Sequence, residues 1–416
     1  LNPTLNSIVH QFEGSCKLPH GITVDAATNL ELLGSSAGID PAVTLGMMSE
    51  SSSRHFTVQS GGVLCLTGLH LTGGKQVGGK GGTLYITGAI NAVSYLIIVG
   101  CLIESGTGKT NNVAQHGGII YIGENSRVNI EGSTLQNTQS QYAGAMWITG
   151  RNLALAEDAS SHAHGTYPPT VNITSTIIQD CVASSASNHQ GNGGAIRIRM
   201  GSILNVQSST FKSNTGDYGG AIFTDHNVAV ALANTTFDGN SANWDGGAIF
   251  STASSTIHLY ESTFQSNTAS RFSGGVLIKD VTNIYLQRGS NTFTDNSDTK
   301  SCRSICREGD TSGNNGAEIT SKIFFAVYPP NIANDGKLVQ TGIDVKKGIN
   351  VDFVGRKCPA GEESTVDRTA CTLIGKHFPM YDERSSGYCT DVASSGYIAT
   401  MEACEEAASA IGFIST

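Results

Sequence analysis

The sequence predicts an all-β fold, a single-stranded parallel β-helix, and two repeating markers carry the prediction. A glycine pair recurs at residues 193, 219, 246 and 274, with steps of 26, 27 and 28 residues. A phenylalanine followed three residues later by asparagine keeps the same phase, at Phe211, Phe237, Phe264 and Phe293. Self-similarity at such a period indicates a solenoid, a propeller or an array.

The segments between the markers have the character of short β-strands. Runs such as VAVAL and TIHLY alternate along the chain and are bounded by Gly, Asn, Asp and Ser. No run keeps helical spacing over three turns. A propeller blade needs about 40 residues, and the fixed leucine frame of a leucine-rich repeat is absent. A β-helix coil of about three short strands fits the period.

The position two residues after each glycine pair predicts a buried column. It holds only aliphatic residues or Met: Leu64, Leu84, Ile120, Met146, Ile196, Ile222, Ile249 and Leu277. Because side chains alternate across a strand, the next position faces outward. That position is largely aromatic and holds Cys65, Tyr85, Tyr121, Trp147, Arg197, Phe223, Phe250 and Ile278.

This outward stripe has three interpretations, and the sequence leaves all three open. The chain's own loops or C-terminal module cover it, since exposed apolar patches of this size are uncommon on monomers. Alternatively it is a subunit contact, because aromatic residues are enriched at interfaces. The third interpretation is a surface on which carbohydrate rings stack.

The phenylalanine–asparagine unit predicts the end of a strand and a turn. Apolar pairs such as Leu204 and Val206 precede each phenylalanine, which we expect to pack inward. The asparagine suits a left-handed turn in which it bonds its own main chain. Stacked turns then give a ladder of asparagine amides.

The alternating GGA(I/L/V) and FxxN motifs resemble the repeats of the chlamydial polymorphic outer membrane proteins (Pmp) and of related bacterial and algal surface proteins. The resemblance is strict over residues 193–296, relaxed over about 61–192, and does not reach the C-terminal region. It implies a right-handed parallel β-helix displayed outside the cell, with an adhesive or structural role.

The chain divides into three expected regions. Residues 1–60 form an N-terminal cap and irregular first coils, and residues 61–300 form the regular β-helix with an insertion near 151–169. Residues 301–416 form a small cysteine-rich module with one short helix, which Thr400 caps and Gly412 ends. The tail is similar to cysteine-rich extracellular modules of microalgae. The solenoid should have roughly nine or ten coils.

Composition restricts the possible partners. The 416 residues carry a net charge of −9 with only 14% charged residues, which argues against nucleic acid or an anionic membrane as partner. No apolar run is long enough for a transmembrane helix, so no membrane span is expected. No signal peptide is recognised, and a start at Leu1 indicates a processed or cropped product.

Cysteines and glycosylation triplets favour an extracellular or cell-surface location. Six of the ten cysteines follow residue 300, a clustering that favours disulfides in an oxidising compartment. The candidate disulfide cysteines are Cys16, Cys65, Cys302, Cys306, Cys358, Cys371, Cys389 and Cys404, with Cys16 and Cys65 one conceivable pair. Asn172 and Asn234 begin acceptor triplets for N-glycosylation.

No catalytic, metal-binding or cofactor-binding group is predicted. Arg197 and Arg199 project from one strand, but no pair of carboxyl groups lies beside them for acid–base chemistry. His162 and His164 lie in a serine-rich segment without further ligands, so a surface role is favoured.

The expected function is therefore structural. We expect a subunit of a surface filament, a flagellar hair resembling a mastigoneme, a sheath or a matrix, which associates with itself or with other surface proteins. One alternative is an adhesin that binds glycans. The other is a polysaccharide lyase or hydrolase, since some right-handed β-helices have these activities.

Overall fold

The computed structural model describes the chain most fully between residues 6 and 299. The described ranges are 6–12, 15–26, 28–34, 43–47, 53–104, 114–150, 167–184, 191–279, 283–286, 291–299, 305–307, 322–325, 350–353, 362–364 and 371–373. The predicted C-terminal helix, the insertion from 151 to 166, and His162 and His164 lie outside them.

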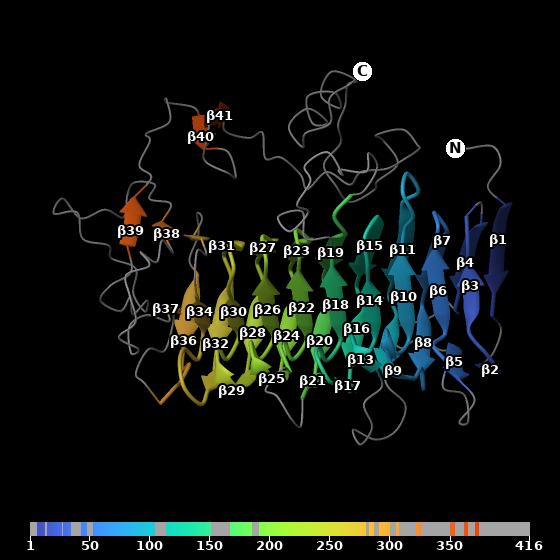
Figure 1. Cartoon of the computed structure of the whole chain (residues 1–416), viewed down its shortest axis with the longest axis horizontal. Coiled ribbons are helices and arrows are strands. Elements are labelled where there is room, and N and C mark those ends of the chain that lie inside the picture. Colours follow the sequence, from blue (N-terminus) through green and yellow to red (C-terminus); the bar gives the residue numbers. More distant parts are fainter. Residues whose placement is uncertain are drawn as a thin grey trace, which may run out of the picture. The chain divides into compact units, whose positions relative to one another are not determined.

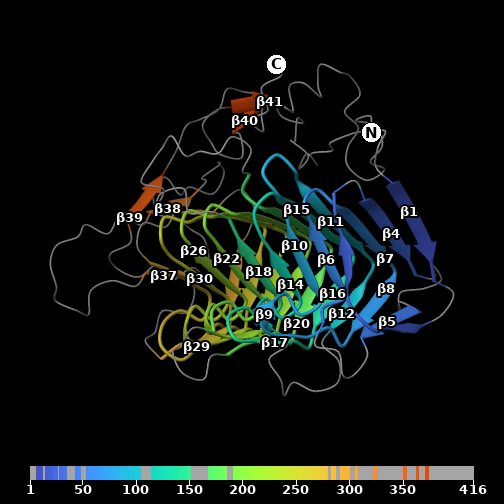
Figure 2. The same ribbon diagram turned by 45° about the vertical axis from the view of Figure 1, so that its right-hand side comes forward.

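The protein is an all-β parallel solenoid, which confirms the predicted fold class at that level. Within the described residues every strand pair between Asn6 and Val354 is parallel, and no helix occurs. Figure 1 shows the strands standing side by side, and Figure 2 separates the sheets that form the sides of the solenoid.

Sheet A forms the longest side, with twelve strands. In order they are β1 (Asn6–Gln11), β4 (Thr28–Leu33), β7 (Val63–Thr67), β11 (Ser94–Val99), β15 (Ser126–Glu131), β19 (Thr170–Thr174), β23 (Ile203–Gln207), β27 (Ala229–Ala233), β31 (Thr256–Tyr260), β35 (Asn283–Leu286), β38 (Lys322–Phe325) and β39 (Asn350–Phe353). Parallel pairing therefore continues past residue 300.

Sheet B follows sheet A in each turn and carries the phenylalanine positions. Its strands are β2 (Cys16–Leu18), β5 (Val43–Met47), β8 (Leu69–Thr72), β12 (Leu102–Glu104), β16 (Thr134–Gln136), β20 (Ile177–Gln179), β24 (Thr210–Lys212), β28 (Thr236–Asp238), β32 (Thr263–Gln265) and β36 (Thr292–Thr294).

Sheet C carries the aliphatic column and its outward neighbours. Its strands are β3 (Ile22–Val24), β6 (Phe56–Gln59), β10 (Leu84–Thr87), β14 (Ile120–Ile122), β18 (Met146–Thr149), β22 (Ile196–Arg199), β26 (Ile222–Asp225), β30 (Ile249–Ser251), β34 (Val276–Ile278) and β37 (Ile305–Arg307).

A fourth sheet, which the expected three-stranded coil lacks, lies between sheets B and C. Sheet D consists of β9 (Gln76–Lys80), β13 (Ala114–His116), β17 (Gln139–Ser140), β21 (Val182–Ala183), β25 (Thr215–Tyr218), β29 (Ser241–Asp245) and β33 (Thr268–Ala269). Several of these strands are only two residues long and mostly polar, so they give little alternation from which a strand can be predicted. Residues 362–364 and 371–373 form one antiparallel pair, β40 (Glu362–Ser364) and β41 (Cys371–Leu373), in the second compact unit.

The aliphatic column of sheet C lies inside the solenoid, as predicted. Six members are at most 1% exposed and stack in register: Leu84, Ile120, Met146, Ile196, Ile222 and Ile249. Two inward residues of sheet C, Thr224 and Ser251, are polar. Their hydroxyl groups form a 2.6 Å hydrogen bond with each other. A core of this kind derives its stability from apolar burial.

The glycine pairs are required by the corner that precedes sheet C. The first glycine takes a left-handed backbone, with φ of 77° at Gly193 and 65° at Gly219. At the second glycine the backbones of successive turns nearly touch, since a Cβ on Gly194 would lie 2.0 Å from the carbonyl oxygen of Gly220. Only glycine meets both conditions.

The phenylalanines and asparagines form two buried columns beside each other. The rings of Phe211, Phe237, Phe264 and Phe293 stack with centroids 4.7 to 4.9 Å apart. In the asparagine column, each side-chain amide nitrogen donates to the next residue's Oδ1, at 3.0 Å from Asn214 to Asn240 and 2.9 Å from Asn240 to Asn267.

The backbone of this turn differs from our expectation. The left-handed residue is the one before the asparagine, for example Ser213 with φ of 52° and Gly239 with φ of 63°. The asparagine side chain points inward and accepts from the main-chain N–H of the neighbouring turn, rather than bonding its own main chain. The ladder is thus a contact between turns.

Candidate functional site

The six residues predicted to face outward on sheet C form one continuous row. Strand pairing places Tyr85, Tyr121, Trp147, Arg197, Phe223 and Phe250 in register on six consecutive strands, β10 to β30. In a parallel sheet, in-register residues of neighbouring strands lie on the same face. We call this set the outer row.

The two ends predicted for this stripe were wrong. Gly61 and Gly62 precede a strand of sheet A, so Cys65 pairs with Ile97 and lies on another side of the solenoid. At the other end, Val276 rather than Leu277 pairs with Ile249, a shift of one residue. Ile278 therefore faces the core, and Leu277 extends the outer row.

The outer row is covered by side chains of the same chain. Trp147, Phe223 and Phe250 are only 5 to 6% exposed. Phe223, Phe250 and Leu277 form an apolar cluster with Tyr218 and Phe272, outside the main core. A second cluster joins Tyr121, Ala143 and Trp147 to Tyr85 and Tyr142. The row therefore offers little free apolar area to a partner.

Cationic side chains lie over the aromatic rings of the row. The guanidinium of Arg54 is 4.8 Å from the Tyr85 ring centroid, and the Lys80 ammonium is 4.6 Å from that of Tyr121. Arg197 lies between two rings, 4.6 Å from Trp147 and 5.2 Å from Phe223. Partly desolvated cation–π contacts of this kind are each worth about 0.5 to 2 kcal/mol.

Four basic residues gather around Trp147, and we call them the basic cluster: Lys80, His116, Arg197 and Arg199. The His116 ring meets the Trp147 ring edge-on at 4.5 Å, and Lys80 pairs with His116 in sheet D. Burial and, to a smaller extent, the charges of Lys80, Arg197 and Arg199 lower the pKa of His116 to about 4. His116 is therefore neutral near pH 7, and Lys80, Arg197 and Arg199 give the cluster a local positive potential in a chain whose net charge is −9.

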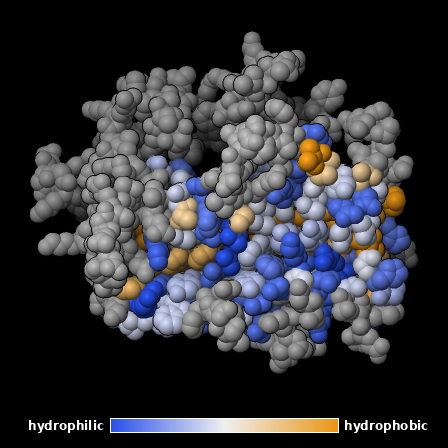
Figure 3. All heavy atoms as spheres, in the orientation of Figure 1, coloured by the Kyte–Doolittle hydropathy of each residue, from blue (hydrophilic) through white to orange (hydrophobic). Residues whose placement is uncertain are grey.

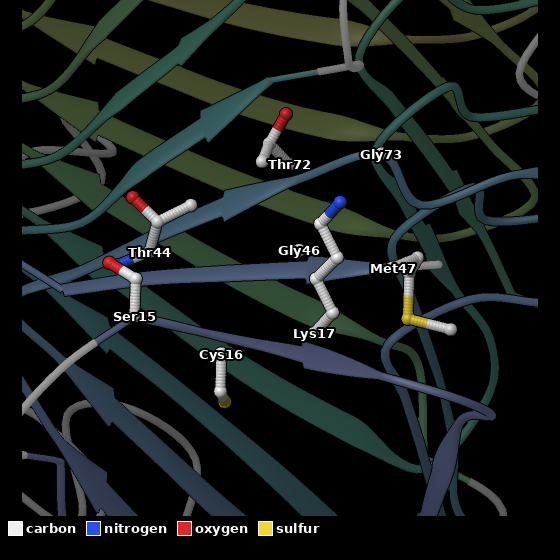
Figure 4. Close-up of a pocket in the computed structure, with 8 residues that line it drawn as sticks. All are labelled: Ser15, Cys16, Lys17, Thr44, Gly46, Met47, Thr72 and Gly73. Atoms are coloured by element: carbon white, nitrogen blue, oxygen red, sulfur yellow. The ribbon is translucent and has the colours of Figure 1, made fainter. Parts of the chain in front are cut away.

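A shallow groove of about 440 Å³ lies on the outer face of sheet B near the N-terminal end (Figure 4). It exists because Gly46 has no side chain between Lys17 and Thr72, its two partners in register. Lys17 extends past this glycine in Figure 4, and Ser15, Thr44 and Met47 line the remaining sides.

A hydrogen-bonded polar network continues from this groove along sheet B. The Thr44 hydroxyl lies 3.3 Å from Nδ1 of His70, and His70 Nε2 lies 3.0 Å from Oε1 of Glu104. Gln136 donates to Oε2 of Glu104 at 2.9 Å, and Gln179 donates to Gln136 at 2.8 Å. Partial burial raises the pKa of Glu104, but hydrogen bonds from Gln136, His70 and Asn137 outweigh it and leave the pKa below its ordinary value.

This network was not predicted from the sequence. His70 and Glu104 are 34 residues apart, and their pairing depends on loop lengths that vary from turn to turn. The only usable signal is that both occupy outward positions of short strands. Glu104 is the one carboxylate of this network among the described residues, so the network offers no pair of carboxyl groups for acid–base chemistry.

The cysteines of the described solenoid carry free thiols. Cys16 is exposed on β2 of sheet B and Cys65 is half-buried on β7 of sheet A, so the two are not joined and the conceivable pair was wrong. Burial raises the pKa of Cys65 and of Cys101 to about 11, so these thiols are protonated and unreactive at neutral pH. The side chains of Cys302, Cys306, Cys358, Cys371, Cys389 and Cys404 lie outside the described part.

The two glycosylation triplets have different surroundings. Asn234 is exposed at the corner between sheets A and B, where its φ is 49°. Asn172 lies in the middle of β19 and is half-buried, with its amide nitrogen donating to Asn129 and its Oδ1 accepting from Asn205, both at 2.9 Å. A glycan on Asn172 would break this outer ladder, whereas Asn234 has room for one.

Comparison with known proteins adds no relative, because no family model, curated protein or solved structure matches this chain. Among the described residues, no three His, Cys, Asp or Glu side chains are placed to hold a metal ion. The same part of the chain contains no helix that is long and apolar enough to cross a bilayer.

Buried histidine makes the stability of the solenoid sensitive to acid. His55 is fully buried, and its Nε2–H donates to the Leu45 carbonyl at 2.9 Å, while Nδ1 has no partner. Burial lowers its pKa to about 4, although backbone hydrogen bonds with Leu45 and Thr72 raise it. The imidazole is therefore neutral in the folded state.

We expect stability to fall as pH drops from about 6.5, the ordinary pKa of unfolded histidine, towards 4. Over this range His55 binds a proton in the unfolded chain but stays neutral in the folded one. The free energy of unfolding therefore falls by roughly 3 kcal/mol by pH 4. Urea unfolding at several pH values measures the slope. His55→Gln, which retains the donor to Leu45, should have a flatter profile, and the exposed His20→Gln should match the wild type. Equal slopes in all three would refute the assignment.

Proposed function

We propose that this protein is an extracellular structural protein whose right-handed β-helix assembles end to end into a surface filament, a flagellar hair, a sheath or a matrix. The observation that carries the proposal is the edge of β1, the first strand among the described residues. There, large apolar side chains and a strand edge are exposed together.

The first strand, β1, has a hydrogen-bonded neighbour on one side only among the described residues, namely β4. Ile8 is 53% exposed although it occupies an inward column, in register with Leu30 and Leu64. Val9 is 58% exposed on the opposite face of the same strand. In Figure 3 the coloured part of this face is mostly hydrophilic, and one of its groups of hydrophobic residues lies at the right-hand edge, on the side where β1 lies in Figure 1.

An open edge of a parallel stack fits the opposite edge of a second copy of the chain. Each turn pairs with the next by nearly the same step along the solenoid, so a head-to-tail copy continues sheets A, B and C with the same geometry. Such a heterologous contact does not close on itself and builds a filament. Unpaired strand edges are the usual templates for this association.

The remaining features agree with a structural role. Side chains of the same chain cover the outer row, so it is not available to a neighbouring molecule. Lateral contacts between copies would therefore use the polar faces and the C-terminal region, which supplies six of the ten cysteines. The resemblance of the GGA(I/L/V) and FxxN repeats to Pmp-type surface proteins supports display outside the cell. The exposed Asn234 triplet is compatible with a secreted glycoprotein.

We expect Ile8→Lys to weaken end-to-end association about tenfold or more, because the apolar contact is lost and a charge is placed at the edge. Light scattering over a concentration series measures the association constant, and negative-stain microscopy shows the assemblies directly. The matched control is Ile90→Lys, since Ile90 is 59% exposed but lies in the turn between Ala89 and Ala92.

The control should assemble like the wild type. If both lysine variants behave alike, association does not use the N-terminal edge. If the native protein is monomeric at every concentration, the structural proposal itself fails.

A further inference from the structure

Arg197 is a charged side chain enclosed by aromatic rings. Its guanidinium is enclosed between the rings of Trp147 and Phe223, and its Nε is buried with no hydrogen-bond acceptor. Within the described part of the chain it makes no ion pair. Burying a cation without a hydrogen-bonded anion is costly, so proteins rarely retain such a group unless something compensates for it.

Nearby groups act on Arg197 in both directions, and burial has the largest effect. Burial and the nearby charge of Arg199 lower the pKa of Arg197 to about 10, although Asp225 and Tyr142 raise it. The carboxylate of Asp225 is shared, since its Oδ2 lies 3.5 Å from Nη2 of Arg199 and its other oxygen contacts His226. Asp225 is therefore engaged, and the Nε of Arg199 is also buried without an acceptor.

We propose that the basic cluster of Lys80, His116, Arg197 and Arg199 binds one oxyanion group, a carboxylate or a sulfate, beside Trp147. Two guanidinium groups that project from alternate positions of β22 present the forked donors that such planar or tetrahedral anions accept. The inference is independent of the end-to-end assembly, because it concerns sheet C rather than the N-terminal edge.

The ligand should be a single anionic group rather than a long polyanion. The charge is local, since the chain as a whole carries −9. The row on either side of the cluster is apolar, with Tyr121 on one flank and Phe223 on the other. A uronic acid or sulfated sugar of an extracellular matrix presents such a group, and so does a free small anion.

The test uses the fluorescence of Trp147, because the protein has only two tryptophans. In a Trp244→Phe background, sulfate, galacturonate and polygalacturonate are titrated at constant ionic strength, which is held with sodium chloride. We expect a saturable change in emission for the small anions. Arg197→Met should raise Kd at least tenfold, and Arg199→Met should also weaken binding.

Arg54→Met is the matched control, since Arg54 stacks on Tyr85 in the same row but has no second arginine beside it. It should bind like the wild type. Thermal unfolding gives a second measurement: sulfate should raise the melting temperature of the wild type more than that of Arg197→Met, whose response reports the general salt effect. Without anion, Arg197→Met should be at least as stable as the wild type.

The titration with polygalacturonate shows whether the anion is free or belongs to a polysaccharide. Binding of polygalacturonate that depends on Arg197 indicates a group on a polysaccharide, and binding of the small anions alone indicates a free anion; either result supports the site. The proposal is overturned if the emission change does not saturate, or if the wild type, Arg197→Met and Arg54→Met respond alike.

Discussion

Asn240→Leu is expected to lower the free energy of unfolding by roughly 4 kcal/mol, although leucine has the same number and branching of side-chain heavy atoms as asparagine. Asn240 is fully buried, and its Oδ1 accepts from both the main-chain and the side-chain nitrogen of Asn214. Removing this oxygen leaves two buried donors without an acceptor, each costing about 1 to 3 kcal/mol. The carbonyl of Phe211 also loses a donor.

Urea unfolding measures the loss, and hydrogen exchange locates it. The amide of Asn214 should exchange much faster in Asn240→Leu, because its acceptor is gone. Amides of β1 and β4, many turns away, should change little, since each turn of a solenoid contacts only its neighbours.

The control for this prediction is Asn243→Leu in β29. Asn243 is exposed and makes one hydrogen bond, to Oδ1 of Asp217 at 2.9 Å. We expect a loss below about 1 kcal/mol. Comparable losses at 240 and 243 would mean that the asparagine ladder contributes nothing beyond ordinary surface contacts.

The solenoid was predictable because its repeats reflect contacts between neighbouring turns. A glycine pair is needed wherever two backbones approach as closely as at Gly194 and Gly220, and a buried column needs an aliphatic residue in every turn. Both requirements recur at the period of one turn. The sequence therefore indicates that the turns stack on one another, even though each described strand is only two to six residues long.

The two wrong ends of the outward stripe lie where the glycine pair does not keep its usual spacing from a strand of sheet C. Gly274 and Gly275 lie one residue out of step with Gly246 and Gly247, which exchanges the environments of Leu277 and Ile278. Both are aliphatic, so hydrophobicity alone cannot distinguish them. Gly61 likewise precedes a strand of sheet A, and no local property of the pair indicates which corner it occupies.

The candidate sites were only partly predictable. The outer row follows from alternation within strands, but its cover does not, because Tyr142 and Phe272 lie outside the strands and Tyr218 ends a strand of sheet D, which was not predicted. The isolation of Arg197 depends on which acids lie nearby in space. Asp225 lies near Arg199 because the two residues pair between neighbouring strands. The sequence alone does not show which acidic residue takes this position.

Phe237→Ala is expected to cost about 4 kcal/mol in the free energy of unfolding, within the usual range for a buried phenylalanine. Phe237 is fully buried in the middle of the ring column. Its ring is parallel to those of Phe211, at 4.9 Å, and Phe264, at 4.7 Å, so truncation removes two stacking contacts and opens a cavity between turns. Parallel stacking at this distance adds about 0.5 to 1.5 kcal/mol per pair beyond burial.

Two further variants separate burial from stacking. Phe237→Leu retains most of the apolar volume and should cost about 1.5 kcal/mol, most of it the lost stacking. Phe293→Ala should cost less than Phe237→Ala, because Phe293 is 8% exposed and stacks on Phe264 alone among the described rings. Urea unfolding of the three variants gives the comparison. Equal losses for the two alanine variants would show that a second ring neighbour adds no stability. A negligible loss at 237 would mean that the phenylalanine column does not lie in the core. That result would contradict the solenoid fold.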